Sequence, residues 1–143
     1  MRISDILKSK GSQVYTINME QSIQETIQSL VMHNIGALLV LDDQEKLVGI
    51  ISERDILRKN ANQTVILKDT KVKDVMTSNL IIGVPNDDIE YIMGIMTKNR
   101  IRHLPVLDEE KVVGIVSLGD VVKAQLTEKE YDNRYLKQYM FGH

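Results

Sequence analysis

A serine followed three positions later by an aspartate occurs twice in this sequence, each time in the motif Gly-x-x-Ser-x-x-Asp. The pairs are Ser52 with Asp55 and Ser117 with Asp120. An apolar run ends at each serine and a helical pattern follows, which puts the aspartate in the first helical turn. Its carboxylate could accept two hydrogen bonds from the neighbouring hydroxyls of a ribose, and the helix amides could bind phosphate. Aspartate also caps helices without any ligand, so the motif alone leaves both roles open.

The other polar residues do not form a set that could catalyse a reaction. The histidines His33, His103 and His143 are widely spaced, and the sequence has neither a glycine-rich phosphate loop nor a Gly-x-Ser-x-Gly motif. The absence of cysteine excludes a cysteine nucleophile and a cysteine-based metal site. We therefore expect no enzyme activity, no catalytic cofactor and no metal.

The elements that position the two motifs repeat along the chain. Residues 35–42 match residues 101–108, and residues 47–52 match residues 112–117 with an offset that is one residue shorter. The change of offset falls in a polar turn, where length is free to vary. The flanking segments Ile3–Leu7 match Val72–Met76 as well. The chain is therefore interpreted as two copies of one unit.

Each copy is predicted to contain an extended piece, a helix, two buried strands and a second helix. Ser22-x-x-Glu25 can form a capping box at the start of the first helix, and Asp87-x-x-Glu90 is expected to open its counterpart. Pro105 lies within a predicted strand and cannot donate to a ladder, so that strand should begin there or lie at an edge. The predicted ranges are 14–17, 37–41, 47–51 and 53–60 in the first copy, and 80–84, 104–107, 111–116 and 120–126 in the second.

Apolar stripes mark the buried faces of the first helix in each copy. The expected core residues are Ile23, Ile27, Leu30 and Val31, then Ile89, Ile92, Met93 and Met96. Methionines at this spacing are interpreted as core rather than as ligands.

One copy of about 45 residues is too small to bury a stable core. We therefore predict an α+β fold in which two βαββα repeats pack with pseudo-twofold symmetry into one module, followed by a C-terminal helix. The predicted organisation is an N-terminal segment (1–11), a first repeat (12–60), a linker (61–76), a second repeat (77–126) and a helical tail (127–143).

Composition limits the class of partner and the location. The 143 residues carry a net charge of −2, which gives no reason to expect nucleic acid or anionic membranes as partners. No apolar run approaches the roughly 18 residues of a membrane span, and the N-terminus has no apolar signal region. We expect a cytoplasmic protein.

The repeated elements resemble the CBS domain (cystathionine-β-synthase type). The resemblance rests on Ile-Gly-Ala-Leu-Leu-Val from Ile35, on Arg-His-Leu-Pro-Val from Arg102 and on the Gly-Ile-Ile-Ser and Gly-Ile-Val-Ser runs. It extends from about Ile3 to about Leu126 and is strongest to stand-alone bacterial CBS pairs. Such pairs, called Bateman modules, usually bind AMP, ADP or ATP, and some bind NAD(H) or S-adenosylmethionine. The resemblance thus implies an adenine-nucleotide-binding regulatory or sensor module, with AMP as the first choice.

The resemblance also implies two unequal ligand sites between the repeats. Arg102 and His103 would face the phosphates, although an isolated pair of this kind is usually solvated, and the first repeat has Gly36 and Ala37 instead. Lys10 would add a phosphate contact or remain a surface lysine, and Arg58 is expected to pair with Asp55 or Glu53 rather than bind phosphate. The better site would combine Asp120, Ser117, His103, Arg102, Ile35, Gly36, Ala37, Lys10 and Gly11. The second would combine Asp55, Ser52, Arg54, Ile81, Ile82 and Pro85.

The tail concentrates the aromatic residues of the chain. Thr127-x-x-Glu130 can form a capping box, and Tyr131, Tyr135 and Tyr139 recur every four residues before Met140 and Phe141. Such a stripe should be buried against its own module or against a second copy, and CBS pairs commonly dimerise, so we expect a homodimer. Any output would pass through an unknown effector protein. The alternative function is a structural or adaptor module whose ligand sites have decayed, as the unequal repeats suggest.

Overall fold

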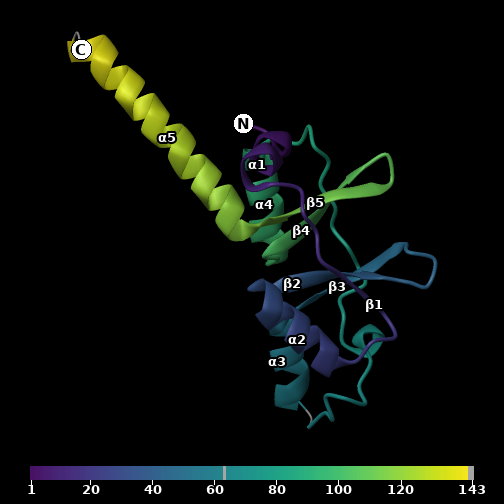
Figure 1. Ribbon diagram of the computed structural model, residues 1–143. Coiled ribbons are helices and arrows are strands. Elements are labelled where there is room, and N and C mark those ends of the chain that lie inside the picture. The colour runs from purple at the N-terminus through teal and green to yellow at the C-terminus, as the bar shows by residue number, and fades with distance from the viewer. Residues whose placement is uncertain (63, 142–143) are drawn as a thin grey trace. The chain divides into compact units, whose positions relative to one another are not determined.

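The chain forms two compact units in the computed structural model, which describes residues 1–62 and 64–141 (Figure 1). One unit is Val14–Ile81 and contains the first repeat. The other combines Met1–Gln13 with the chain from Ile82 onward and contains the second repeat. They are called here the first-repeat unit and the second-repeat unit. The mixed α+β fold with two small sheets agrees with the sequence prediction.

The first-repeat unit is built on a three-stranded sheet in the order β1-β2-β3. Strand β1 runs parallel to β2, and β2 pairs antiparallel with β3. Helices α2 and α3 lie together on one side of these strands (Figure 1). The elements are β1 (Thr16–Asn18), α2 (Ile23–His33), β2 (Ala37–Leu41), β3 (Leu47–Ser52), α3 (Glu53–Asn62) and the 3-10 turn η1 (Val72–Asp74).

The core of this unit draws on the sheet, on α2 and on η1. Its buried members are Ile17, Ile23, Leu30, Leu38, Val40, Ile51 and Val72. The side chain of Val72 is fully buried although it lies in the stretch between the two repeats. That stretch therefore contributes to folding energy through apolar burial and is more than a connection.

Helix α2 begins as the sequence predicts and buries a slightly different face. The Ser22 side chain accepts from the Glu25 backbone N–H while Glu25 accepts from the Ser22 backbone N–H, which completes the capping box. The prediction that Val31 belongs to the core is wrong, because its side chain is 76 % exposed. The buried stripe runs through Thr26 and Leu30, and Val31 lies about 100° further around the helix.

The second-repeat unit has a two-stranded antiparallel sheet and three helices. Its elements are α1 (Ile3–Lys10), α4 (Ile89–Asn99), β4 (His103–Asp108), β5 (Lys111–Ser117) and α5 (Leu118–Phe141). The extended strand predicted at 80–84 is reduced to one parallel bridge between Gly83 and Val106. The Gly83 N–H donates to the Pro105 carbonyl and the Gly83 carbonyl accepts the Leu107 N–H, while Pro105 has no N–H with which to extend the ladder.

The segments that precede the repeats cross over between the units. Helix α1 precedes the first repeat but belongs to the second-repeat unit, where Ile3 and Ile6 are buried. A Cβ on Gly114 would come within 2.6 Å of Leu7, and a Cβ on Gly49 would come within 2.6 Å of Met76. The matching segments in the sequence thus occupy matching places in the two units.

Two helix starts differ from the prediction. The N-cap of α4 is Asp88 rather than Asp87, because the Asp87 carboxylate accepts the Val84 N–H instead. No helix begins at Thr127, since α5 is one continuous helix of 24 residues in which the Thr127 hydroxyl donates to the Lys123 carbonyl. The side chains of the predicted aromatic stripe, Tyr131, Tyr135, Tyr139, Met140 and Phe141, lie outside the described residues, as does His143. None of the described helices combines the length and apolarity that crossing a bilayer requires.

Candidate functional site

Ser117 and Asp120 form a reciprocal pair where β5 passes into α5. The Ser117 backbone N–H donates to Asp120 Oδ2 over 2.8 Å, and the Asp120 N–H donates to Ser117 Oγ over 3.1 Å. This is the arrangement of a capping box, so the helix-capping role of the motif is real. It also fixes the carboxylate in one orientation, with Oδ1 unpaired within the described part of the chain.

Lys10, the last residue of α1, contacts the same carboxylate. Its Nζ lies 2.6 Å from Asp120 Oδ2 and 3.0 Å from the Ile115 carbonyl oxygen. Burial would raise the pKa of the Asp120 carboxyl, but the hydrogen bonds from Lys10 and Ser117 and the Lys10 charge outweigh it and lower that pKa. Lys10 therefore joins the site through the carboxylate and not as an unattached surface lysine.

Ser117 also lines an open hollow of about 590 Å³, whose lining does not include Asp120 or Lys10. His103 pairs with Ser117 across β4 and β5, and the Leu118 N–H donates to the Arg102 carbonyl, so the start of β4 lies beside the start of α5. The hollow continues along one face of α5. Its lining residues are Arg102, His103, Ser117, Leu118, Gly119, Val122, Lys123, Leu126, Thr127 and Glu130.

The corresponding carboxylate of the first repeat has a different set of partners. Asp55 Oδ2 accepts the N–H and the hydroxyl of Ser52 at 2.9 and 3.0 Å. Its second oxygen accepts the Thr77 hydroxyl at 3.2 Å. The expected pairing of Arg58 with Asp55 or Glu53 does not form among the described residues. Asp55 is thus held by neutral donors on both oxygens, whereas Asp120 is held by a cation on one.

The structure brings together part of each predicted site. Lys10, Arg102, His103, Ser117 and Asp120 meet in the second-repeat unit, and Gly11 follows Lys10 with a φ of 92° that suits glycine. The residues Ile35, Gly36 and Ala37 belong to the first-repeat unit. Of the second site, Ser52, Asp55, Arg54 and Ile81 lie in the first-repeat unit, and Ile82 and Pro85 lie in the other.

Two residues that the sequence analysis did not single out belong to these surroundings. Lys123 lines the hollow one turn after Asp120, and helical spacing from Asp120 could have indicated it. Thr77 binds Asp55 from a segment 22 positions away. The sequence signal for Thr77 was its position directly after Met76, which ends the segment that matches the N-terminus.

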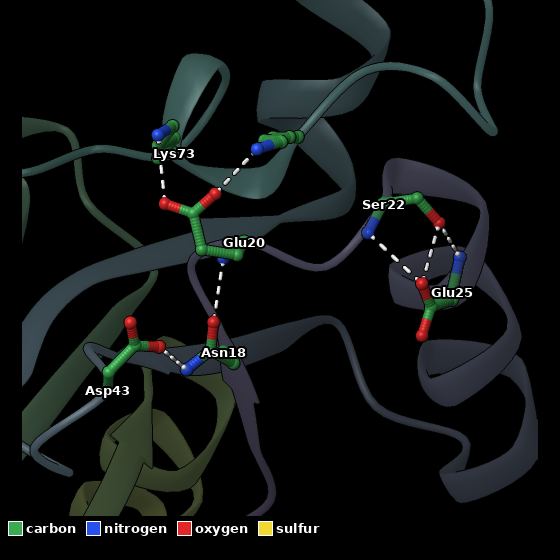
Figure 2. A network of polar contacts seen from close by, with 7 residues as sticks. Asn18, Glu20, Ser22, Glu25, Asp43 and Lys73 are labelled. Atoms are coloured by element: carbon green, nitrogen blue, oxygen red, sulfur yellow. Dashed lines mark hydrogen bonds and ion pairs between the residues drawn. The ribbon is translucent and has the colours of Figure 1, made fainter.

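A second polar network lies in the first-repeat unit and has a structural role (Figure 2). The Glu20 carboxylate accepts from Lys71 over 2.7 Å and from Lys73 over 2.8 Å. The hydrogen bonds from Lys71 and Lys73 lower the pKa of Glu20 to about 2. This contact ties the segment around η1 to the loop between β1 and α2. The described residues contain no group of acidic and histidine side chains arranged to hold a metal ion.

The chain belongs to the CBS-domain family. The family model matches residues 3–62 and again residues 72–127, so the chain carries two CBS domains in tandem. It is 39 % identical to the CBS domain-containing protein CBSX3, mitochondrial, of Arabidopsis thaliana, with 98 % of this chain and 72 % of the relative covered.

Solved structures of CBS-domain proteins share the fold. A CBS-domain containing protein from Agrobacterium tumefaciens is 37 % identical, with a TM-score of 0.83 and coverage of 87 % of this chain and 92 % of that one. The CBS domain pair of protein MJ0100, solved with 5-methylthioadenosine and S-adenosyl-L-methionine, is 28 % identical with a TM-score of 0.74, and covers 90 % of this chain and 98 % of its own.

Proposed function

We propose that this CBS pair is a regulatory or sensor module that binds an adenine nucleotide, AMP first, with ADP, ATP and NAD(H) as the other candidates. The observation that carries the proposal is the Asp120 carboxylate, which Ser117 and Lys10 hold through Oδ2 while Oδ1 has no partner among the described residues. Ser117 also lines an open hollow. The adenosine ligands bound by the similar pair of MJ0100 support the adenosine part of the ligand.

Each residue of the proposed site has a role that follows from its chemistry. Asp120 accepts the ribose hydroxyls, and Ser117 holds Asp120 in place. Arg102 and His103 bind the phosphate, since the hollow they line also includes Ser117, the partner of the carboxylate. The adenine would contact Ile35, Gly36 and Ala37 of the first repeat, and Lys10 and Gly11 complete the site.

A second site would be organised around Asp55 and Ser52, with Arg54 toward the phosphate and Ile81, Ile82 and Pro85 toward the base. It should bind ligand more weakly, because Thr77 already donates to the second oxygen of Asp55, whereas the second oxygen of Asp120 has no partner among the described residues. The same observation favours the alternative function, an adaptor that works through protein contacts. In both cases the module acts on an effector protein without catalysing a reaction, and we expect it to do so in the cytoplasm.

Thermal unfolding with AMP, ADP, ATP, NADH and S-adenosylmethionine tests the proposal. A ligand at 100 times its dissociation constant should stabilise the protein by about 2.7 kcal/mol, or several degrees. Asp120→Asn is the better variant than Asp120→Ala, because the amide oxygen preserves the cap on α5. Asp120→Asn should remove most of the shift, and the matched Asp55→Asn should remove little. No shift with any of the five ligands would overturn the sensor function and leave the adaptor.

A further inference from the structure

Lys10 makes in the second-repeat unit the two contacts that Thr77 makes in the first-repeat unit. Each binds one strand carbonyl and one motif carboxylate, and the equivalent acceptors are Ile50 with Ile115 and Asp55 with Asp120. Thr77 donates its backbone N–H to the strand carbonyl over 2.9 Å and its hydroxyl to the carboxylate over 3.2 Å. Lys10 donates from Nζ to both, over 3.0 and 2.6 Å. A flexible charged side chain therefore takes the place of a backbone contact.

The backbone that carries these contacts differs between the two units. Leu7 and Met76 pack on matching glycines, so the residues that follow them, Lys8 and Thr77, are equivalent. Thr77 forms an antiparallel bridge with Ile50, in which each N–H donates to the other carbonyl. Lys8 instead lies in the last turn of α1. The same place in the repeat is thus extended in one unit and helical in the other.

The last turn of α1 is extra length relative to the other repeat. Ile17 and Gly83 occupy equivalent places beside β2 and β4. Leu7 precedes Ile17 by ten residues, whereas Met76 precedes Gly83 by seven. The three extra residues make about one helical turn, Lys8–Lys10. A helix of eight residues is marginal on its own, so the contacts of its last residue help decide whether this turn forms.

Strand β5 has an unused donor at the edge where Lys10 binds. Ile115 lies opposite Pro105, whose carbonyl accepts from Gly83 on the far side of β4. The two opposite residues are therefore a pair without mutual hydrogen bonds, and the Ile115 N–H is directed away from β4. It has no partner there among the described residues, whereas the equivalent N–H in β3 donates across its bridge. An extended Lys8 would supply the missing carbonyl.

We propose that the last turn of α1 is a two-state element, which ligand binding at Asp120 converts from a helical turn into an extended bridge with β5. In the helical state, which the structure shows, Lys10 holds Asp120. Oδ2 already accepts from Ser117 and Lys10, so a ribose whose hydroxyls take one carboxylate oxygen each displaces Lys10. Lys8 then bridges Ile115, and the ammonium of Lys10 is available to the phosphate.

This inference rests on the proposed function and gives it an output. Occupancy of the carboxylate becomes a change of backbone conformation in the segment before the first repeat, which an effector protein can read. The coupling is reciprocal, because a ligand that favours the extended state is bound more tightly by a chain already in that state.

Backbone NMR of the full chain with and without AMP tests the conversion. AMP should move the Cα chemical shift of Lys8 from a helical to an extended value and slow exchange of the Ile115 amide at least about tenfold. The Ile50 amide is already bridged and is the control, with an unchanged rate. Binding of AMP without both changes would overturn the two-state element and leave the nucleotide site intact. If the chain binds none of the five ligands, the proposed function fails, and ligand-free variants decide the element alone.

Ser9→Pro and Lys10→Met test the element without ligand. Proline excludes the helical conformation of the residue before it, and Lys10→Met removes the ion pair. Both variants should show the extended shift of Lys8 and the slowed Ile115 amide in the absence of AMP. Ser78→Pro, at the equivalent position of the other repeat, and Lys8→Met, which keeps Lys10, should change neither. An Ile115 amide that exchanges in both test variants as fast as in the wild type would overturn the proposal.

The affinity of Ser9→Pro for AMP separates this element from a purely structural α1. Because the variant populates the state that the ligand favours, its AMP dissociation constant should fall about three- to tenfold. If the last turn served only to hold Asp120 in place, Ser9→Pro would weaken AMP binding or leave it unchanged, and either result counts against the two-state element. If Ser9→Pro does not fold, the Ile115 amide of Lys10→Met gives the decision.

Discussion

At the scale of single residues, the two repeats differ most in what surrounds one carboxylate. Asp55 is held by the hydroxyls of Ser52 and Thr77, and Asp120 by the amide of Ser117 and the ammonium of Lys10. Neutral donors already bond to both oxygens of Asp55, which leaves less for a ligand to gain. The cation at Asp120 keeps that carboxylate ionised and oriented, while its other oxygen has no partner among the described residues.

Replacing Lys10 by methionine should raise the pKa of Asp120. Burial of the carboxyl raises its pKa, and in this variant the hydrogen bond and the positive charge of Lys10 no longer oppose that effect. Because folding lowers the pKa of Asp120, its ionised carboxylate stabilises the folded protein at pH values above the ordinary pKa of aspartate. This contribution is lost as the pH falls through the lowered pKa. The variant should therefore lose stability at neutral pH and little in strong acid. Carboxyl carbon chemical shifts during a pH titration report the pKa directly, and Lys8→Met in the same helix is the control. An unchanged pKa in Lys10→Met would refute the ion pair.

Glu20 should make the first-repeat unit sensitive to acid. Its pKa is about 2 in the folded protein against the ordinary 4.5, so its contribution to stability is present above 4.5 and disappears as the pH falls toward 2. Glu20→Gln should lower the unfolding temperature at neutral pH and converge with the wild type near pH 2. Unfolding temperatures measured across that range decide the matter. Glu130 is an exposed carboxyl in α5, and the unfolding temperature of Glu130→Gln should differ from that of the wild type by the same amount at every pH. A constant difference of this kind for Glu20→Gln would count against the lysine contacts.

At the scale of elements, each hairpin has a glycine that makes room for a segment from outside its repeat. Gly49 receives Met76, and Gly114 receives Leu7. The two places are equivalent in the repeat but differ in what a side chain would meet. A Cβ on Gly114 would meet only the flexible end of the Leu7 side chain. A Cβ on Gly49 would also lie 2.9 Å from the Thr77 backbone oxygen.

Gly49→Ala should therefore destabilise the protein more than Gly114→Ala. A leucine side chain can rotate away from a new methyl group, but the Thr77 carbonyl is held by its hydrogen bond from Ile50. We expect Gly49→Ala to cost about 1–3 kcal/mol, the usual range for overpacking, and Gly114→Ala to cost less. Urea unfolding of the two variants gives the comparison. Equal costs would show that the backbone near Thr77 yields as readily as the Leu7 side chain.

Sequence patterns predicted the elements well where local chemistry decides them. Rules that act within a few residues explain the capping box at Ser22, the strands with their β-branched residues and the helices that begin within each Ser-x-x-Asp motif. The errors arose where distant contacts decide. Val31 fits the apolar stripe of α2, but the sheet and η1 bury only part of that stripe. Asp87 fits an N-cap, but its carboxylate is taken by the Val84 amide.

The candidate site was predictable in its motif and not in its partners. Ser117 and Asp120 were visible because their spacing recurs, and their contact depends only on the turn between β5 and α5. The Lys10 contact spans 110 residues and depends on where α1 packs, which no local rule gives. The continuity of α5 through Thr127 was missed for a related reason, because a capping sequence inside a helix keeps its helical bonds when nothing interrupts them.

At the scale of the whole molecule, the chain exchanges its short leading segments between the two units. Ile3 precedes the first repeat and is buried in the second-repeat unit, and Val72 precedes the second repeat and is buried in the first-repeat unit. The second-repeat unit is assembled from two separate stretches of sequence, whereas the first-repeat unit is one continuous stretch, Val14–Ile81. The second-repeat unit closes a loop that contains the whole first-repeat unit when α1 packs, whereas the first-repeat unit closes only the short stretch between α3 and η1.

Ile3→Ala should weaken the second-repeat unit, although Ile3 stands next to the first repeat in sequence. Truncating a fully buried isoleucine costs about 2–5 kcal/mol through lost burial and the cavity left behind. Native-state hydrogen exchange should show this loss in the amides of α4, β4 and β5, with β2 and β3 much less affected. Val72→Ala, the matching position, should give the reverse pattern. If instead each variant loosened the repeat that follows it in sequence, the exchange of segments would be refuted. If both variants lowered the protection of all strands equally, the two units would unfold as one, and the exchanged leading segments would be the contacts that couple them.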